Sequence, residues 1–359
     1  MKLFTVGPVE MYNDLLSGCN EQIPYFRNEW FSNIMFELDA NIKAVANMSE
    51  NDKNLVLTCS GTGAMEAVVM NCLSENDKVL IIVGGTFGQR FEALCKIHNI
   101  AYDVIKVENA QPFDSECLKM YESKGYTALL VNIDETSVGQ LYPIDILSEF
   151  CVRNNMLFIV DAISSLFADE IDFTENKIDA LIFSSQKALA LAPGVSVVSL
   201  SERICKEHIV GNAKTMYFDF SSYLTNGLRG QTPFTPAIGI IVQMNEMIGR
   251  IKEMGIEQKI AMTRNLAEDF RDKAVAASFK VPQYPLSNAL TPILFKSRAM
   301  LYYEKLIEGF GITVNPCGGE NADKMLRVGH MGNLTVEDND MLIKALCEIR
   351  SKLDNGKFD

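Results

Sequence analysis

The stretch ALIFSSQKAL, residues 180–189, indicates how the middle of this chain folds. It begins with four apolar residues, which small polar residues and Lys187 follow at once. A similar apolar run, LFIV at 157–160, ends at Asp161, 26 residues before Lys187. Short, continuous apolar runs are typical of strands that helices cover on both faces. We therefore expect Asp161 and Lys187 to follow the carboxyl ends of two buried strands.

This pair of residues suits the chemistry of pyridoxal 5′-phosphate (PLP). A lysine can form a Schiff base with the aldehyde of PLP. An aspartate can keep the pyridine nitrogen protonated, so that the ring accepts electrons. The alternative is a surface lysine after a strand and a helix-capping aspartate, and the pair alone leaves both interpretations open.

A possible phosphate site precedes the pair. The run LVLT (55–58) reads as a strand, CSGTG (59–63) as a turn, and residues 64–73 as a helix rich in good helix formers. Glycines at a helix N-terminus let backbone N–H groups approach an anion, and the helix dipole adds partial positive charge. The turn matches neither a P-loop nor a dinucleotide-binding fingerprint. Alone, it could be simple strand-to-helix punctuation; followed by Asp161 and Lys187, it forms a much rarer combination.

The chain resembles the class-V aminotransferases, which are fold-type I PLP enzymes, and within them the alanine–glyoxylate, serine–pyruvate and 2-aminoethylphosphonate–pyruvate group. The matching motifs run through most of the chain in the family's order: TVGP (5–8), SGTGAMEA (60–67), GTFGQR (85–90), DETSVG (134–139), VDAISS (160–165), SQKAL (185–189), TPFTP (232–236) and LRVG (326–329). The Asp161 and Lys187 motifs are specific together, whereas the glycine turns and Thr-Pro pairs are weak singly. The resemblance implies a PLP-dependent transaminase that acts on a small amino acid or amine and a small 2-oxo acid.

The resemblance also implies a set of site residues. Lys187 would be the Schiff-base lysine and proton shuttle, and Asp161 the partner of the pyridine nitrogen. Phe87 would stack on the cofactor ring, although a core phenylalanine is the alternative. The residues expected to bind the cofactor are Ser60, Gly61, Thr62, Phe87, Thr136, Ser137, Asp161, Gln186, Lys187, Thr232 and Thr235.

Two residues are expected at the substrate. Gly7 would line the pocket with its backbone, and Arg327 would grip the substrate carboxylate with a bidentate pair. A salt-bridging arginine is the alternative for Arg327. Arg27 either faces a second anionic group of the substrate or lies on the surface. A threonine of the 232–235 loop would reach the phosphate of the other subunit, which implies a homodimer with shared sites; the sequence does not say which threonine.

The bulk properties restrict the function further. The chain has 359 residues, a formal charge of −13 and a pI near 4.9, which argues against nucleic acid or anionic membrane as a partner. Nine cysteines without a C-x-x-C and three separated histidines give no metal motif. Unpaired cysteines suit a reducing cytoplasm, and we find no signal peptide and no long apolar span.

Strand–helix alternation predicts an α/β fold with a mostly parallel, doubly wound sheet. We expect an N-terminal arm (1–20), a large PLP-binding domain (21–250) and a small C-terminal α+β domain (251–359). Helices are expected across 237–280 with a break at Gly255, and a closing helix at 335–353 with Thr335 as its N-cap. Residues 354–359 should be a frayed tail. The expected strands are 55–58, 79–83, 101–105, 128–133, 157–160, 180–183, 195–200, 290–295, 312–314 and 325–328.

Several residues depart from the family pattern. Cys59 stands where the family often has glycine. Residues 132–134, Asn-Ile-Asp, stand where relatives often have a histidine together with Gly or Cys. Residues 166–168 stand in place of a Leu-Gly-Gly turn. Phe167 and Asp134 could therefore reshape the pocket. A PLP lyase or cysteine desulfurase that uses Cys317 is an alternative, but Gln186 stands where desulfurases have histidine. A catalytically silent PLP-fold scaffold is the third interpretation.

Overall fold

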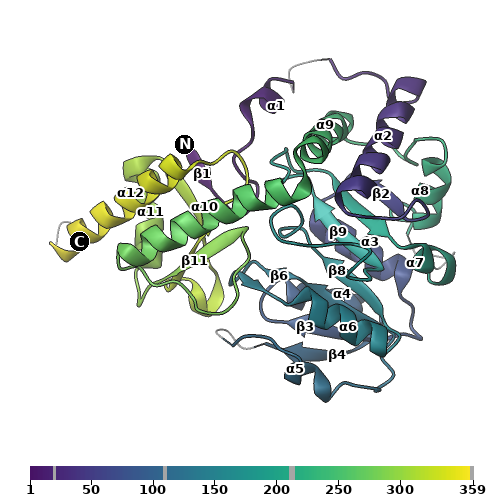
Figure 1. The fold of residues 1–359 in the computed structure, drawn as a ribbon, viewed down its shortest axis with the longest axis horizontal. Helices are drawn as coiled ribbons and strands as arrows, with labels where there is room; N and C mark the ends of the chain where they lie inside the picture. The colour runs from purple at the N-terminus through teal and green to yellow at the C-terminus, as the bar shows by residue number, and fades with distance from the viewer. Residues whose placement is uncertain (19–21, 108–110, 210–214, 356–359) are drawn as a thin grey trace.

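The computed structural model describes residues 1–18, 22–107, 111–209 and 215–355, and it contains two main sheets joined by long helices (Figure 1). Within these residues, seven strands form the larger sheet. Their order across the sheet is β2 (Lys53–Leu57), β10 (Ser196–Leu200), β9 (Ala180–Ser184), β8 (Leu157–Asp161), β5 (Ala128–Asn132), β3 (Lys78–Val83) and β4 (Ala101–Lys106). This confirms the expected mixed α/β fold with its mostly parallel sheet.

Strand β10 alone runs against its neighbours in this described sheet. It pairs antiparallel with both β2 and β9, whereas β9, β8, β5, β3 and β4 pair in parallel. Because β2 and β9 are both antiparallel to β10, they run in the same direction. The carboxyl ends of β2, β5, β8 and β9 therefore meet at one edge of the sheet.

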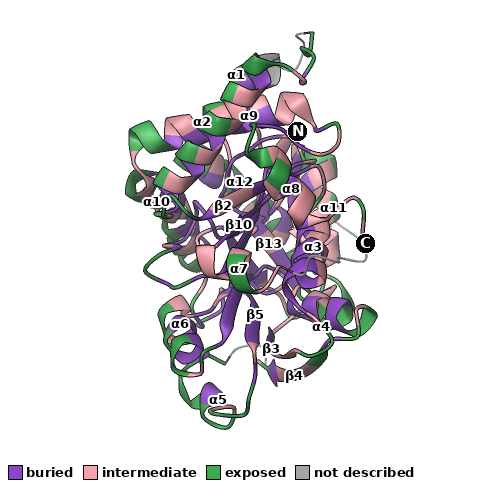
Figure 2. Ribbon diagram, turned by 90° about the vertical axis from the view of Figure 1, so that its right-hand side faces the viewer, coloured by how far each residue is buried: buried purple, intermediate pink, exposed green. Residues whose placement is uncertain are grey.

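Both faces of the larger sheet are covered, as the continuous apolar runs predict. Along β9, Leu181 and Phe183 lie in one hydrophobic cluster, and Ala180 and Ile182 lie in another. This alternation arises because successive side chains of a strand point to opposite faces. Figure 2 shows the resulting buried strands between the helical layers. The edge strand β4 instead alternates between exposed and partly buried residues.

Helices form the layers on either side of the sheet. Helix α3 packs on β9 and β10, α4 on β3, and α6 on β8, while α2 packs on α9. Short helices lie around them at the surface. The bounds are α1 (Asn13–Gly18), α2 (Glu29–Val45), α3 (Gly61–Cys72), α4 (Gly88–Ile97), α5 (Glu116–Lys119), α6 (Ile144–Arg153), α7 (Glu202–Glu207), α8 (Phe220–Gly227) and α9 (Ile238–Met254).

The second sheet combines the start of the chain with its last third. Within the described residues its order is β1 (Lys2–Phe4), β12 (Ile312–Pro316), β13 (Met325–Gly329) and β11 (Leu290–Leu294). Helices α10 (Ile256–Ala276), α11 (Ala299–Phe310) and α12 (Val336–Asp354) cover it, and a 3₁₀ turn spans Gly319–Asn321. The first strand thus lies in the C-terminal sheet, parallel to β12.

The expected helix boundaries in this part are confirmed. Gly255 separates α9 from α10 and adopts a φ of 94°, which favours glycine. Thr335 caps α12 and forms a capping box with Asp338. Residues 356–359 of the expected tail lie outside the described residues, and the domain boundaries near residues 20 and 250 stay a prediction.

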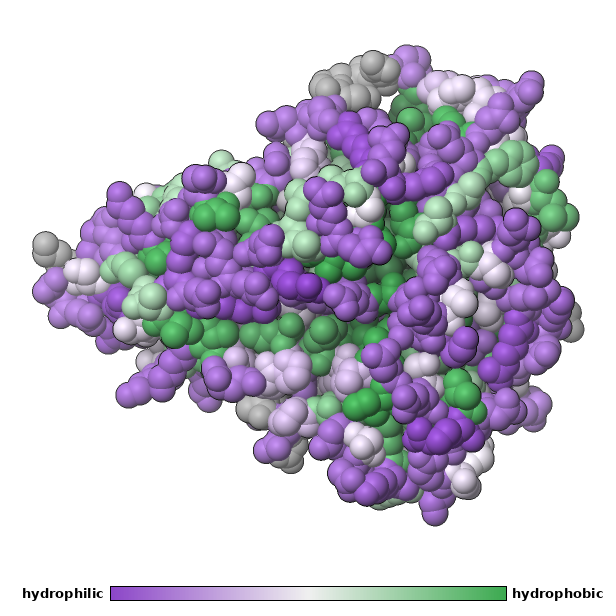
Figure 3. Space-filling model, viewed as in Figure 1, coloured by the Kyte–Doolittle hydropathy of each residue, from purple (hydrophilic) through white to green (hydrophobic). Residues whose placement is uncertain are grey.

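Helix α10 starts beside α9 and extends along the smaller sheet (Figure 1). The face seen in that view is largely hydrophilic, and apolar surface shows mainly in the middle of the molecule, where α10 crosses between the two sheets (Figure 3). A two-stranded ribbon of β6 (Asp134–Glu135) and β7 (Gln140–Leu141) lies between them as well. The junction therefore receives side chains from both parts of the chain.

Candidate active site

The structure gathers sequence-distant residues at the carboxyl edge of the larger sheet. Asp161 is the last residue of β8, and Lys187 follows β9 by three residues. Arg327 reaches them from β13, and Gly7 follows β1. Ligands of open α/β sheets bind outside the carboxyl ends of the strands, so this edge is the candidate active site.

Lys187 is partly accessible, but protein surrounds most of its side chain. Its Nζ donates a hydrogen bond to the carbonyl oxygen of Val6 at 2.8 Å. A Cβ at Gly7 would lie 2.6 Å from the Cδ of Lys187, so only glycine leaves the lysine enough room there. Burial lowers the pKa of Lys187 to about 8, although the nearby carboxylates Asp134 and Asp161 raise it. An amine with a pKa near 8 is partly deprotonated at physiological pH, so it can act as a nucleophile and as a base.

Asp161 is buried at the base of the site. Its Oδ1 accepts a hydrogen bond from the backbone N–H of Ile163, and its Oδ2 accepts one from Asn132 Nδ2, each at 2.9 Å. Burial raises the pKa of Asp161 to about 6, and these hydrogen bonds oppose the increase. Asn132 is its register partner in β5, so the sheet itself fixes the orientation of the carboxyl.

The expected phosphate turn forms the N-terminus of α3. Ser60 is the N-cap of this helix, and its Oγ accepts a hydrogen bond from the N–H of Gly63 at 3.5 Å. A Cβ at Gly61 would come within 2.3 Å of Ile163 Cδ1, so a larger residue there would push the Ile163 side chain aside. Thr62 Oγ1 accepts a hydrogen bond from Arg90 at 2.7 Å. The turn thus combines a helix N-terminus with a nearby guanidinium.

The loop before α4 carries Phe87 beside this turn. The carboxylate of Glu135 accepts hydrogen bonds from the N–H groups of Phe87 (3.3 Å) and Gly88 (2.9 Å). Ser137 Oγ also donates to Glu135, at 2.5 Å, so the same carboxylate joins two loops. The guanidinium of Arg90 lies 4.8 Å from the centre of the Phe87 ring. Phe87 is half-buried at the site edge rather than enclosed in the core.

Arg327 presents an unpaired group to the site. Its two terminal nitrogens donate to the carbonyl oxygens of Thr136 (2.9 Å) and Pro316 (2.8 Å). Its Nε is buried and has no hydrogen-bond partner among the described residues. The guanidinium plane is therefore fixed by two carbonyls while part of its donor fork remains available to an anion.

The two threonines of the 232–235 loop differ in burial and in hydrogen bonding. Thr232 is buried, and its hydroxyl donates to the carbonyl of Phe234 at 2.8 Å, whereas Thr235 is exposed. Arg27 does not extend into the site; it donates to the carbonyls of Thr232 (2.7 Å) and Pro233 (3.0 Å). The structure therefore makes Arg27 a support of this loop.

The remaining expected site residues lie at or near the edge. Gln186 is half-buried next to Lys187, and its carbonyl accepts from the N–H of Val9 at 3.3 Å. Phe167 instead belongs to the core, where its ring meets Phe183 edge-on at 5.8 Å. Phe167 thus does not shape the pocket as the sequence suggested.

Cys317 directly follows β12 and interacts with Arg327. Its thiol donates to the carbonyl of Ser137 at 3.8 Å. Burial raises the pKa of this thiol, and Arg327 opposes the increase only in part. A nucleophilic cysteine requires the thiolate, so this environment disfavours the desulfurase alternative.

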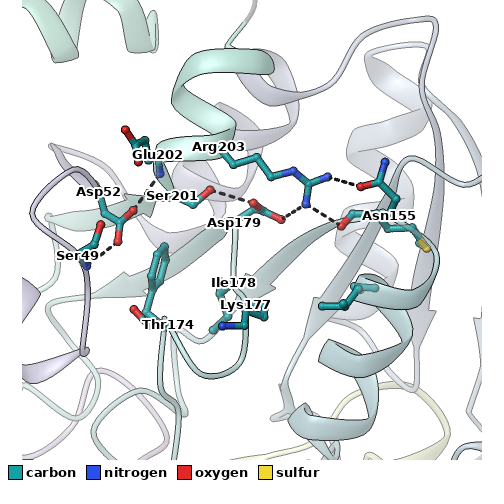
Figure 4. A pocket seen from close by; sticks show the side chains of 14 residues that line it. Ser49, Asp52, Asn155, Thr174, Lys177, Ile178, Asp179, Ser201, Glu202 and Arg203 are labelled. Carbon is teal, nitrogen blue, oxygen red and sulfur yellow. Dashed lines mark hydrogen bonds and ion pairs between the residues drawn. The ribbon is translucent and has the colours of Figure 1, made fainter.

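A separate pocket of about 470 Å³ lies at the other edge of the larger sheet (Figure 4). Several of its charged groups are engaged with one another and with the backbone. Arg203 pairs with Asp179 at 3.5 Å, and Asp52 accepts from the backbone N–H groups of Ser49 and Glu202. It lies at the amino ends of β8 and β9, away from Lys187, so we do not assign the function to it.

The residues at the carboxyl edge fit PLP. Asp161 offers a buried carboxyl, Lys187 a deprotonatable amine, and the N-terminus of α3 an anion site. Gly7 and Gly61 leave space that a Cβ would fill. The fold and the site together define a PLP-dependent enzyme of fold type I.

Comparison with known proteins identifies the family within this class of enzymes. The family described as aminotransferase class-V matches residues 12–281, and the chain belongs to this family. It is 30% identical over 342 residues to an uncharacterized aminotransferase of Methanocaldococcus jannaschii, covering 92% of this chain and 87% of that protein. It is 28% identical over 354 residues to the alanine–glyoxylate aminotransferase of Oryctolagus cuniculus, covering 93% and 88%. The crystal structure of an alanine–glyoxylate aminotransferase from Nostoc sp. superposes with a TM-score of 0.91 at 24% identity, covering 97% and 94%. The protein is thus a PLP-dependent aminotransferase.

Sequence reasoning missed three contributors to this site. Arg90 stands in the GTFGQR motif, but nothing in the sequence showed that it would reach Thr62. Asn132 and the carbonyl of Val6 hold Asp161 and Lys187 in place. The match of Asn132 to Asp161 in register requires knowledge of which strands pair, which periodicity does not supply.

Proposed function

We propose that this aminotransferase moves an amino group from a small amino acid or amine to a small 2-oxo acid. The donor would be of the alanine, serine or 2-aminoethylphosphonate type, and the acceptor glyoxylate or pyruvate. The observation that carries this proposal is the buried Nε of Arg327, which has no hydrogen-bond partner in the described part of the chain, on a guanidinium that two carbonyls hold in place. The name of the rabbit relative, alanine–glyoxylate aminotransferase, supports the choice of substrates.

Each residue has a proposed task. Bound PLP supplies an electron sink for the substrate Cα carbanion. Lys187 would anchor the cofactor covalently before substrate binds, and its amine, when not bound to the cofactor, would take up and return the proton at the substrate Cα. Asp161 holds the pyridine nitrogen protonated. Arg327 binds the substrate carboxylate through a bidentate pair and so orients the Cα–H bond. Gly7 lines the substrate space with its backbone.

The remaining cofactor contacts come from the loops around the edge. Ser60, Gly61 and Thr62 would bind the phosphate at the N-terminus of α3, and Arg90 would add a positive charge there. Phe87 would cover one face of the ring. Gln186, Thr136 and Ser137 would complete the polar side of the site.

We propose a homodimer whose two sites are shared. Thr235 is the exposed threonine of its loop, and Thr232 is committed to Phe234, so Thr235 would reach the phosphate of the partner subunit. Exposed apolar side chains nearby, on Tyr25, Trp30 and Leu228, supply surface for such contact.

We also propose a cytoplasmic location. The eight cysteines in the described ranges are all free, which suits a reducing compartment. Among the helices of those ranges, none has the length and apolar character to cross a membrane.

A donor–acceptor screen tests the proposed function. Purified protein would be offered single amino donors with glyoxylate or pyruvate, and the new keto acid and amino acid would be quantified. Lys187→Ala should remain folded, lose the characteristic absorbance of lysine-bound PLP and lose turnover. Lys259→Ala removes another buried lysine and should keep both. Retained transamination in Lys187→Ala near the wild-type rate would refute the role of this lysine.

A further inference from the structure

Glu135 is a buried acidic residue to which the proposed reaction gives no task. It ends β6 and is almost fully buried. Its Oε2 accepts a hydrogen bond from the N–H of Gly88 at 2.9 Å, and its Oε1 accepts one from the N–H of Phe87 at 3.3 Å. Ser137 Oγ donates to Oε1 and accepts from the N–H of Thr86 at 3.3 Å. One carboxylate and one hydroxyl therefore hold three consecutive backbone N–H groups.

The carboxylate caps helix α4 from a distant segment. Helix α4 begins at Gly88, and its N-cap residue Phe87 makes no side-chain hydrogen bond to the first N–H groups. These groups have no partner inside a helix, and a negative charge beside them is favourable. Glu135 supplies the missing cap from 47 residues further along the chain. The position at which α4 begins, and with it the backbone of Phe87, therefore depends on Glu135.

Two glycines bring this loop into direct contact with the segment of Glu135. A Cβ at Gly85 would lie 2.0 Å from Ser137 Oγ and 2.7 Å from the Glu135 carboxyl carbon. A Cβ at Gly84 would lie 2.0 Å from the hydroxyl oxygen of Tyr142. Neither glycine has the positive φ that by itself favours glycine. The absence of side chains thus serves the close approach of the two segments.

The turn after Glu135 does not depend on this carboxylate for its shape. The N–H groups of Val138 and Gly139 donate to the carbonyl of Glu135 at 3.0 and 2.8 Å, which closes the turn through the backbone. Inside the turn, the carbonyl of Thr136 accepts from Arg327 at 2.9 Å. A change confined to the carboxylate should therefore leave the turn in place and release mainly the Phe87 loop.

We propose that Glu135 is a positioning residue for the cofactor, which acts by holding the Phe87 ring against the face of bound PLP. A stacked ring contributes most when its plane and distance are fixed, and a loop with unbound N–H groups would lose that order. Glu135 thus contributes to cofactor binding through the backbone of Phe87. The inference rests on the proposed role of Phe87, and it adds the residue that makes this role possible.

Titration of the cofactor-free, full-length protein with PLP tests this inference without any substrate. In Glu135→Gln, an amide NH2 replaces one carboxylate oxygen and so opposes one of the N–H donors. We expect PLP to bind about 3–10-fold more weakly, with a similar loss in Phe87→Ala, which removes the ring itself. The double variant should bind within about twofold of the weaker single variant, because both changes remove the same ring contact. Protein fluorescence and the visible absorbance of lysine-bound PLP would measure the affinities.

Asp52→Asn is the matched control for a lost helix cap. Asp52 is buried, and its Oδ1 accepts from the N–H of Glu202, the first residue of α7, at 2.9 Å. It lies directly before β2, at the opposite edge of the sheet. This variant should lower the free energy of unfolding, as Glu135→Gln does, and leave PLP affinity unchanged. An equal loss of PLP affinity in both variants would reveal a general effect of stability and overturn the proposal.

Gly85→Ala disturbs the same contact from the other side and needs no change at Glu135. Its Cβ would displace Ser137, so we expect PLP to bind about 3–10-fold more weakly here too. Gly309→Ala is its control, because open space surrounds the added Cβ, and PLP affinity should stay the same. If Glu135→Gln fails to fold, this pair decides the question, and unchanged affinity in Gly85→Ala would overturn the proposal.

The remaining outcomes separate this inference from the proposed function. If Phe87→Ala weakens PLP binding and Glu135→Gln does not, or if the two losses multiply in the double variant, the inference is wrong and the role of Phe87 stands. If Phe87→Ala binds PLP as the wild type does, the proposed ring contact is wrong and the inference fails with it. A donor–acceptor screen without activity changes neither result.

Discussion

At the scale of single residues, burial sets the chemistry of the site. Lys187 and Asp161 are groups that would be fully charged at neutral pH in water. Burial shifts the pKa of Lys187 down to about 8 and that of Asp161 up to about 6. Each group therefore titrates close to physiological pH, which suits groups that hold and pass protons.

Asp161→Asn tests the pyridine partner. We expect PLP affinity to fall roughly 10–150-fold, which corresponds to a charge-assisted hydrogen bond of about 1.5–3 kcal/mol, and turnover to fall at least about 100-fold. Asp179→Asn is the matched control, because Asp179 is also buried and bonded to the backbone, but at the opposite edge of the sheet. Fluorescence titration with PLP and steady-state kinetics would measure both. If Asp161→Asn retains affinity and rate, another acid holds the pyridine nitrogen.

Arg327→Lys tests the substrate clamp. A lysine cannot hold the carbonyls of Thr136 and Pro316 and also bind a carboxylate in a fork. We expect the KM for carboxylate substrates to rise roughly 10–150-fold, and PLP affinity to change little. Arg271→Lys, at an arginine that also binds backbone carbonyls, should leave KM nearly unchanged. Kinetics with donor and acceptor varied would decide; a constant KM in both half-reactions would make Arg327 structural.

At the scale of elements, caps and registers hold the site in position. The N-terminus of α3 is placed by the strand β2 before it, and β8 pairs with β5 so that Asn132 meets Asp161. Helix α12 covers the smaller sheet that carries Arg327, and its buried side chains include Leu342, Leu346 and Ile349.

Thr335→Ala should weaken α12 without touching the site. Loss of this N-cap is expected to lower the free energy of unfolding by about 1 kcal/mol, within a range of roughly 0.5–2 kcal/mol. KM and PLP affinity should stay the same. Ser351→Ala, at an exposed position of the same helix, should change stability by less than about 0.5 kcal/mol. Chemical denaturation of the three proteins would measure this, and equal midpoints would show that the capping box contributes nothing.

At the scale of the whole molecule, the proposal that Thr235 reaches a neighbouring phosphate requires a second copy of the chain. The larger sheet supplies the anchor, the smaller sheet supplies Arg327, and the 232–235 loop points its exposed threonine outward. Arg27 and Gln231 fix this loop against the start of α2, since Gln231 Nε2 donates to Ser32 Oγ at 2.8 Å. A partner subunit would therefore meet a preformed loop.

Two heterodimers of equal composition test the sharing of sites. In the first, a Lys187→Ala chain pairs with a Thr235→Ala chain, so the one working lysine receives an intact Thr235 from its partner. In the second, a wild-type chain pairs with the double variant, so the working lysine lacks it. We expect normal PLP affinity in the first and roughly tenfold weaker affinity in the second, for one lost hydrogen bond of about 1.4 kcal/mol. Equal affinities, or a monomer by light scattering, would contradict shared sites.

The sequence alone determined the fold class and where in it Asp161 and Lys187 would lie. Mostly continuous apolar runs indicated strands covered on both faces, and the seven expected strands between residues 55 and 200 became the larger sheet. The end of each run placed Asp161 and Lys187 at the carboxyl edge, because local hydrophobic pattern and chain order carry this information. Gly255 and Thr335 were likewise read from local backbone and capping preferences.

Only the tertiary structure decided which residues meet across the fold. The pairing of β1 with β12, the contact of Arg90 with Thr62, and the hydrogen bond from Ser287 to Asp169 join segments far apart in the chain. The role of Arg27 was left open and that of Phe167 was misjudged for the same reason: neither residue has a local sequence pattern that shows its neighbours. Long-range packing and desolvation arise from the assembled fold, and these two effects set the charges of the site.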